Sequence, residues 1–298
     1  MLLVGYSLIF RMDSKTRKFV LVCLLFLAGL LLFQQLRHYQ PHPMDLGQTQ
    51  RIISMSPSLT EILFELGSGK SLVGVTNYCV YPPETAQIEK IGDFVNPNFE
   101  RILDLHPDLI FAERWTSSRI VSRLRDAGVN VVEIPPPRSI DEIYKTILAV
   151  GQAVSQERKA QEVTKDMRLR IQEIQVRAKT MASRPALYVE IDVPSWTVGG
   201  TSYTSEAISL CGARNIFGDV QKPALQASVE AIFRCDPDII LSFDAKASDF
   251  ARRPGWDQLK AVREGKIIDD IGRNLLSHGN QRLVVGMEQL QARLLTMQ

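Results

Sequence analysis

Histidine and cysteine are scarce in this chain, with four of each among 298 residues. Beyond the N-terminal region the histidines are His106 and His278, which are far apart, so no pair has the spacing of metal ligands. The cysteines there are Cys79, Cys211 and Cys235, and they form no CxxC or Cys/His motif. No metal or other cofactor is therefore expected. Three cysteines allow one disulfide at most, and the sequence does not say whether it forms.

The sequence also lacks a strong charge excess and a catalytic motif. It has 35 Lys and Arg against 33 Asp and Glu, a formal net charge of +2, and no basic patch interleaved with aromatic residues, so nucleic acid is not an expected partner. There is no P-loop, no GxGxxG and no GxSxG. Ser56 and Ser58 flank Pro57 with no obvious base, so helix capping is favoured over nucleophilic catalysis. No catalytic residue is predicted.

A long apolar run occurs near the N-terminus. Phe19–Phe33 holds 15 residues without a charged or polar side chain and follows several basic residues, which is typical of an export segment. No small-residue cleavage site and no lipid-attachment cysteine follow, so an uncleaved anchor is favoured over a cleaved signal peptide or a buried core helix. We expect a basic cytoplasmic N-terminus (1–18), a membrane anchor or signal segment (19–36) and a tether (37–50). Met12 is an alternative start.

One stretch of the remaining chain is repeated. The sequence NFERILDLHPDLIFA (Asn98–Ala112) returns as SVEAIFRCDPDIILS (Ser228–Ser242), 130 residues later and without a gap. Each copy reads as a capping residue, a short helix with an acid in its first turn, Pro-Asp, and a buried strand. Thr60-Glu61 before Gly67 is echoed more weakly by Ser205-Glu206 before Gly212. Two copies predict two similar α/β lobes.

Alternating strand and helix patterns extend this prediction to a fold. We expect an N-terminal lobe over 51–154 and a C-terminal lobe over 184–298. Between them, the segment 155–183 contains neither Gly nor Pro and has apolar residues at helical spacing. This pattern predicts one long inter-lobe helix of roughly 40 Å. The predicted strands are 51–55, 72–75, 109–112, 129–134, 186–191, 239–243 and 266–269, and the other predicted helices include 59–66, 117–127, 140–154, 205–211, 229–234, 256–262 and 281–296.

Three segments carry a resemblance to a known family. RIISMSPSLTEILFELG, VGVTNYCVYPPE and KIGDFVNPNFERILDLHPDLI follow one another from Arg51 as in the periplasmic vitamin B12-binding proteins of ABC importers. The resemblance covers nearly everything from Arg51 onwards. It implies two Rossmann-like α/β lobes joined by one long helix, with a corrinoid such as cobalamin held in the cleft between the lobes. It also implies a monomer on the periplasmic or extracytoplasmic side that delivers its ligand to a permease and its ATPase and catalyses no reaction.

The resemblance implies ligand contacts from both lobes, since the corrin ring needs apolar contact and its amide arms need hydrogen-bond partners. Tyr78 falls on an aromatic position of the family, Phe94 and Trp196 occupy places of aromatic residues, and Trp115 lies near a further one. The polar candidates are Ser58, Asn274 and His278. Packed aromatics and, for His278, a solvated loop residue are the alternative readings. The sequence departs from the family at Ala224, where the familiar B12 binder has Trp.

Two glutamates are candidates for docking on the permease. Glu100 and Glu230 occupy the same first-turn position in the repeat, where an acid interacts favourably with the helix dipole. The resemblance implies that they also dock on arginines of the permease.

The rival ligands are haem and an iron–siderophore, although an acidic siderophore calls for several arginines and only Arg114 and Arg273 are candidates. The rival from another class is an exported α/β enzyme.

Overall fold

A computed structural model describes residues 50–297 apart from 115, 117 and 193–194, and residues 50–298 form one compact unit. The predicted segments 1–18 and 19–36, and the tether up to residue 49, lie outside the described residues. Within the described part of the chain, no helix has the length and apolar character needed to span a bilayer.

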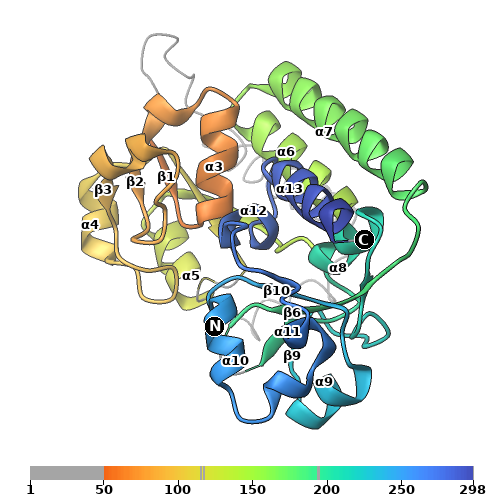
Figure 1. Cartoon of the computed structure of the whole chain (residues 1–298). Coiled ribbons are helices and arrows are strands. Elements are labelled where there is room, and N and C mark those ends of the chain that lie inside the picture. The colour runs from red at the N-terminus through yellow and green to blue at the C-terminus, as the bar shows by residue number, and fades with distance from the viewer. Residues whose placement is uncertain (1–49, 115, 117, 193–194, 298) are drawn as a thin grey trace, which may run out of the picture. The chain divides into compact units, whose positions relative to one another are not determined.

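The N-terminal lobe is built on a five-stranded sheet of order β3-β2-β1-β4-β5, in which every neighbouring pair is parallel (Figure 1). Its central strand β1 pairs with β4 in the register Ile52↔Leu109 and Ile53↔Ile110, and all four of these side chains are buried. A strand with both faces buried is expected where helices cover a parallel sheet. The strands are β1 (Ile52–Ser54), β2 (Leu72–Val75), β3 (Glu89–Lys90), β4 (Leu109–Glu113) and β5 (Asn130–Ile134), and the helices are α3 (Pro57–Glu65), α4 (Phe99–Asp104), α5 (Ser118–Asp126) and α6 (Ile140–Ala153).

The C-terminal lobe repeats this plan with a four-stranded parallel sheet of order β11-β10-β6-β8. A separate antiparallel pair, β7 (Trp196–Val198) with β9 (Ala224–Gln226), was not predicted. Strands of three residues are too short to show an alternating pattern, which is why the sequence did not reveal them. Trp196, a predicted ligand contact, is the first residue of β7. The other elements are β6 (Ala186–Glu190), β8 (Arg214–Asn215), β10 (Ile239–Ser242), β11 (Ile267–Ile268), α8 (Tyr203–Leu210), α9 (Val229–Cys235), α10 (Ala247–Arg252), α11 (Lys260–Arg263), α12 (Arg273–Ser277) and α13 (Leu283–Thr296).

The repeated stretch forms the same local structure in both lobes. Asn98 caps α4 by accepting a hydrogen bond from the N–H of Arg101 at 3.0 Å, and Ser228 caps α9 by accepting one from Ala231 at 3.2 Å. Both helices are followed by a residue in the left-handed region, His106 with φ 44° and Asp236 with φ 37°. The predicted capping residues and the predicted equivalence of the two stretches are confirmed.

The repeated Pro-Asp pair ties each strand to the first strand of its lobe. Asp108 Oδ2 accepts from the N–H of Arg51 at 2.7 Å, and Asp238 Oδ2 accepts from the N–H of Ala186 at 2.8 Å. Burial raises the pKa of Asp238, but the hydrogen bonds from Lys260 and Ala186 and the Lys260 charge outweigh burial, so the pKa lies below its usual value. Each aspartate therefore satisfies a backbone donor where its sheet begins.

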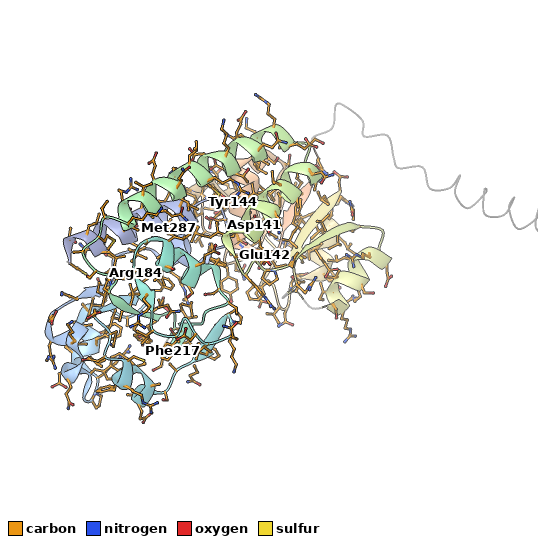
Figure 2. All side chains as sticks on the ribbon, turned by 90° about the vertical axis from the view of Figure 1, so that its right-hand side faces the viewer. Asp141, Glu142, Tyr144, Arg184, Phe217 and Met287 are labelled. Carbon is orange, nitrogen blue, oxygen red and sulfur yellow. The ribbon has the colours of Figure 1, made fainter. Side chains whose placement is uncertain are left out.

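Helix α7 (Glu157–Ala178) contacts both lobes, since it packs against α6 of the N-terminal lobe and against α8 and α13 of the C-terminal lobe (Figure 1). Tyr144 of α6 lies beneath α7, where the guanidinium of Arg168 covers its ring at 3.9 Å (Figure 2). Arg170 of α7 donates to both oxygens of Glu288 on α13, at 2.9 and 2.7 Å. One apolar cluster also runs through α3, α6, α7, α8 and α13. The predicted inter-lobe helix is confirmed.

Helix α7 is shorter than the predicted segment at both ends. Ser155 has φ 54°, a left-handed conformation that separates α7 from α6. At the other end, the Thr180 hydroxyl donates to the carbonyl of Arg177 at 2.8 Å, which competes with continued helical bonding. The 22 residues of α7 give a helix of about 33 Å.

The Ser139 cap of α6 differs in part from a full capping box. The Ser139 hydroxyl accepts from the N–H of Glu142 at 3.2 Å, as the first residue of a capping box does. The Glu142 carboxylate, however, accepts from the N–H of Arg138 at 2.7 Å and not from that of Ser139. The acid therefore satisfies the donor one residue earlier, at the Pro-rich entry to the helix.

The cysteines whose pairing the sequence left open are free thiols. Cys79 and Cys211 are buried and Cys235 is exposed. Burial raises the pKa of the Cys79 and Cys211 thiols, so neither is a reactive thiolate at neutral pH.

Candidate ligand-binding cleft

A cavity of about 760 Å³ lies between the two sheets and is lined by residues of both lobes. Its volume is within the range of small-molecule sites, and most of its lining is apolar. The N-terminal lobe contributes Ser56, Pro57, Ser58, Asn77, Tyr78, Val80, Phe94, Glu113, Pro136 and Pro137, and the C-terminal lobe contributes Ile191, Val198, Ser202, Tyr203, Thr204, Pro223, Ala224, Phe243, Arg273, Asn274, Ser277, His278 and Gly279.

Tyr78 and Phe94 form the aromatic part of the N-terminal wall. Their ring centroids are 5.8 Å apart at an interplanar angle of 55°, and Tyr78 is 56% exposed. An aromatic side chain that is this exposed and lines a cavity leaves apolar surface for a ligand to cover. Of the other predicted aromatics, Trp196 is 43% exposed and is not among the lining residues, and Trp115 lies outside the described residues. The structure therefore brings two of the four aromatic candidates together.

The polar part of the N-terminal wall is a triangle of two serines and a glutamate. Ser56 Oγ donates to Glu113 Oε1 at 2.7 Å, Ser58 Oγ donates to the same oxygen at 2.5 Å, and the two hydroxyls are 2.9 Å apart. Ser56 and Ser58 lie at the start of α3 and Glu113 at the carboxyl end of β4. Ser58, a predicted ligand contact, lines the cavity and has an acidic neighbour that its local sequence does not reveal.

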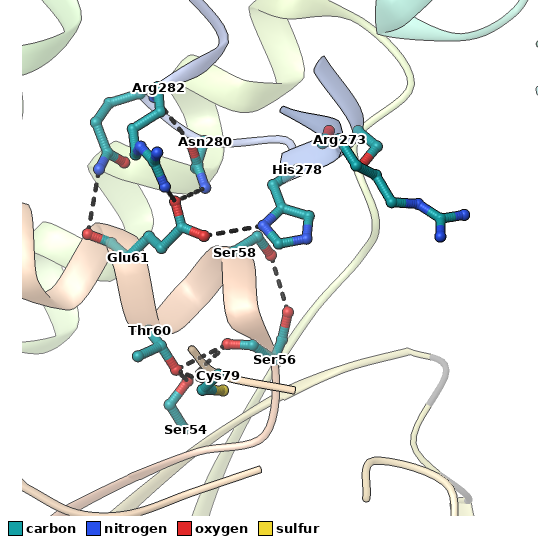
Figure 3. A network of polar contacts seen from close by, with 12 residues as sticks. Ser54, Ser56, Ser58, Thr60, Glu61, Cys79, Arg273, His278, Asn280 and Arg282 are labelled. Atoms are coloured by element: carbon teal, nitrogen blue, oxygen red, sulfur yellow. Dashed lines mark hydrogen bonds and ion pairs between the residues drawn. The ribbon is translucent and has the colours of Figure 1, made fainter. Parts of the chain in front are cut away.

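His278 lines the cavity and belongs to a buried polar network (Figure 3). Glu61 of α3 is 2% exposed, and its carboxylate contacts His278 Nδ1 at 2.9 Å, Asn280 Nδ2 at 3.0 Å and Arg282 Nη1 at 2.9 Å. The side chain of Gln281 also donates to the Glu61 carbonyl at 3.2 Å. All of these donors come from the other lobe, so Glu61 joins the lobes beside the cavity. The reading of His278 as a solvated loop residue is wrong, because its side chain is only 20% exposed.

Asn274, a predicted ligand contact, lines the cavity from the short helix α12. Its neighbour Arg273 donates to Asp244 Oδ2 at 3.0 Å and to the carbonyl of Ile191 at 2.5 Å. The other candidate arginine, Arg114, lines a different cavity beside α6. The two arginines therefore do not form one cationic site for an acidic ligand.

Several cavity residues were missed by the sequence analysis. Glu113 ends β4, Phe243 follows β10 directly, and Tyr203 begins α8. Residues that follow the carboxyl ends of parallel strands commonly face a binding crevice, so this position was a usable signal for Glu113 and Phe243. Tyr203, whose hydroxyl donates to the carbonyl of Ser277, gave no such signal.

Glu100 and Glu230 lie outside the cavity. Both are exposed in the first turns of α4 and α9, at the same place in each lobe. Among the described residues, neither carboxylate forms an ion pair. The two acids are therefore free to meet a surface outside the chain.

Two parallel α/β lobes that share one ligand-sized cavity, joined by a single long helix, define a two-lobed ligand-binding protein. The chain belongs to the periplasmic binding protein family, whose model matches residues 52–271. It is 33% identical to an uncharacterized ABC transporter substrate-binding lipoprotein of Bacillus subtilis, over 82% of this chain and 79% of that protein. Family members are substrate-binding proteins of ABC transporters rather than enzymes.

Relatives and solved structures agree with this class. The chain is 30% identical to the vitamin B12-binding protein of Vibrio cholerae, over 73% of this chain and 79% of that protein. The crystal structure of the periplasmic vitamin B12 binding protein BtuF of Vibrio cholerae has a TM-score of 0.70 at 27% identity, covering 83% of this chain and 97% of that one. A periplasmic heme-binding protein of Roseiflexus has a TM-score of 0.76 at 23% identity, covering 84% and 99%, and shows the shared fold.

Proposed function

We propose that this chain is an extracytoplasmic substrate-binding protein that captures cobalamin or another corrinoid and delivers it to an ABC importer. The observation that carries the proposal is the cavity itself, which combines exposed aromatic surface with hydroxyl, amide and imidazole groups from both lobes. A corrinoid has a large ring with apolar faces and a periphery of carboxamides, and such a ligand needs both kinds of contact. The relatives named as vitamin B12-binding proteins support the same ligand class.

The positions of the cavity side chains support a set of ligand contacts in this proposal. Tyr78 and Phe94 cover a face of the ring, and Ser58, Asn274 and His278 bond its polar arms from opposite sides of the cavity. Trp196 and Trp115 remain candidates for further ligand contacts. Tyr78 is the most readily tested of these assignments, because its ring is exposed and contributes little to the stability of the fold.

Haem and iron–siderophores are the alternative ligands, and heme-binding neighbours share the fold. Both ligands commonly present anionic groups, whereas Arg273 is already paired with Asp244 and Arg114 lies elsewhere. This arrangement favours a ligand with neutral arms. An exported enzyme is disfavoured because the chain belongs to a family of binding proteins. Catalytic turnover that depends on Ser58 would support the enzyme alternative.

We further propose that Glu100 and Glu230 dock on the two permease subunits and that the segment 19–36 holds the chain at the outer face of the inner membrane. Each lobe has one exposed acid at the same helical position, and this arrangement suits a partner with two similar subunits. The chain acts as a monomer in this scheme, with the ATPase on the far side of the permease.

Replacing Tyr78 by alanine should weaken binding of cyanocobalamin by about 1–2 kcal/mol, roughly 5–30-fold, because the aromatic contact with the ring is lost. The free energy of unfolding should change by no more than about 0.5 kcal/mol, since the side chain is exposed. Titration calorimetry and urea unfolding measure the two quantities. Val176→Ala removes an equally exposed apolar side chain from α7 and should change neither. Unchanged affinity in Tyr78→Ala would place the ligand elsewhere.

A further inference from the structure

Glu113 is a carboxylate placed inside the cavity at the carboxyl end of β4. The hydroxyls of Ser56 and Ser58 both donate to Oε1, at 2.7 and 2.5 Å. Among the residues that the structure describes, no side chain is hydrogen bonded to Oε2. The serines thus hold one carboxylate oxygen, and among the described side chains the second oxygen of this cavity-lining residue has no hydrogen-bond partner.

The charge of Glu113 is not neutralised by a neighbour. Within the described part of the chain no cationic side chain forms an ion pair with it. Two basic residues line the cavity and both have other partners, since Arg273 pairs with Asp244 and His278 contacts Glu61. Across the cavity, burial and the charge of Glu113 together raise the pKa of Tyr203, whose hydroxyl is already bonded to the Ser277 carbonyl. Glu113 therefore makes this end of the cavity negative.

We propose that Glu113 is a specificity-determining residue, which accepts a hydrogen bond from a ligand carboxamide and rejects ligands that present a carboxylate at this position. The inference rests on the proposed function and narrows its ligand class. A corrinoid offers N–H donors around its ring. The side arms of haem end in carboxylates, which the negative charge of Glu113 would repel. Selection by an unfavourable contact with the wrong ligand is a general route to specificity.

The test compares two corrinoids that differ in the chemistry of their arms, dicyanocobinamide with carboxamides and dicyanocobyrinic acid with carboxylates. The purified full chain should bind the first at least about tenfold more tightly than the second. Glu113→Gln keeps the shape and the serine bonds but removes the charge, so it should reduce that preference about tenfold, mainly by tighter binding of the acid. Glu65→Gln makes the same charge change at an exposed site of α3 outside the cavity and should leave the preference unaltered.

Ionic strength gives a second readout that needs no mutation. Salt screens repulsion between like charges, so the preference of the wild-type chain should shrink as salt is raised, and that of Glu113→Gln should change less. An unchanged preference in Glu113→Gln, with cobinamide still bound, would overturn the role of Glu113 and leave the proposed function intact. Binding of haemin in preference to both corrinoids by the wild-type chain would overturn both.

Discussion

Replacing Glu61 by alanine is expected to lower the free energy of unfolding by about 3–5 kcal/mol. The side chain is 2% exposed, and its removal leaves Arg282, 22% exposed, without its counter-ion inside the protein. Asn280 and His278 lose an acceptor in the same step. The cost of a partly buried charge without a counter-ion and of two unsatisfied donors exceeds that of ordinary surface substitutions. Urea unfolding followed by circular dichroism measures the change.

The matched control is Glu206→Ala, at the position that the weak echo in the sequence makes equivalent to Glu61. Glu206 is exposed and accepts one backbone hydrogen bond, from Ile140 at 2.8 Å. Its replacement should cost only about 1 kcal/mol. If the two variants were equally stable, the inter-lobe network would not carry the stability assigned to it, because burial is what separates the two glutamates.

Exchanging both Glu100 and Glu230 for arginine is expected to stop corrinoid uptake in cells while leaving corrinoid binding in solution within about twofold of wild type. Both residues are exposed and lie on helices outside the cavity, so the ligand contacts are untouched. Charge reversal on both lobes opposes docking on basic permease surfaces. The lost dipole interactions lower stability by about 0.3–1 kcal/mol each, too little to unfold the chain.

The control is a second double charge reversal, Glu157→Arg with Asp257→Arg. These are also exposed acids in first turns, one in α7 and one in the short helical turn Trp256–Gln258, so the change in net charge is matched. Uptake by this variant should be near normal at equal protein level. Normal uptake by the Glu100 and Glu230 variant would leave those residues with a capping role alone.

The features of the fold that could be predicted from the sequence are those encoded by short local patterns. The repeat predicted the caps at Asn98 and Ser228, and it aligned Asp108 with Asp238, which make the same bond to the first strand of each sheet. The unbroken polar helix between the lobes was visible because neither Gly nor Pro interrupts it. Caps, breakers and periodicity act over a few residues, so a single sequence displays them.

The site was harder to predict because its contacts join distant segments. Glu61 was noticed only as part of an echo, yet its partners lie more than 200 residues later, and Glu206 in the equivalent place has a single bond. Glu113 directly follows the predicted strand 109–112, which was a usable signal, but its partners Ser56 and Ser58 lie more than 50 residues earlier. Contacts between segments this far apart depend on how the chain packs, which local patterns do not encode.

The central claim, that the cavity between the lobes binds a corrinoid, is tested most directly by titration calorimetry of the purified chain with cyanocobalamin, haemin and a ferric siderophore in parallel. The predicted result is one cyanocobalamin bound per chain, at least about tenfold more tightly than either of the others. Tight binding of haemin or the siderophore, with no heat from cyanocobalamin, would contradict the claim.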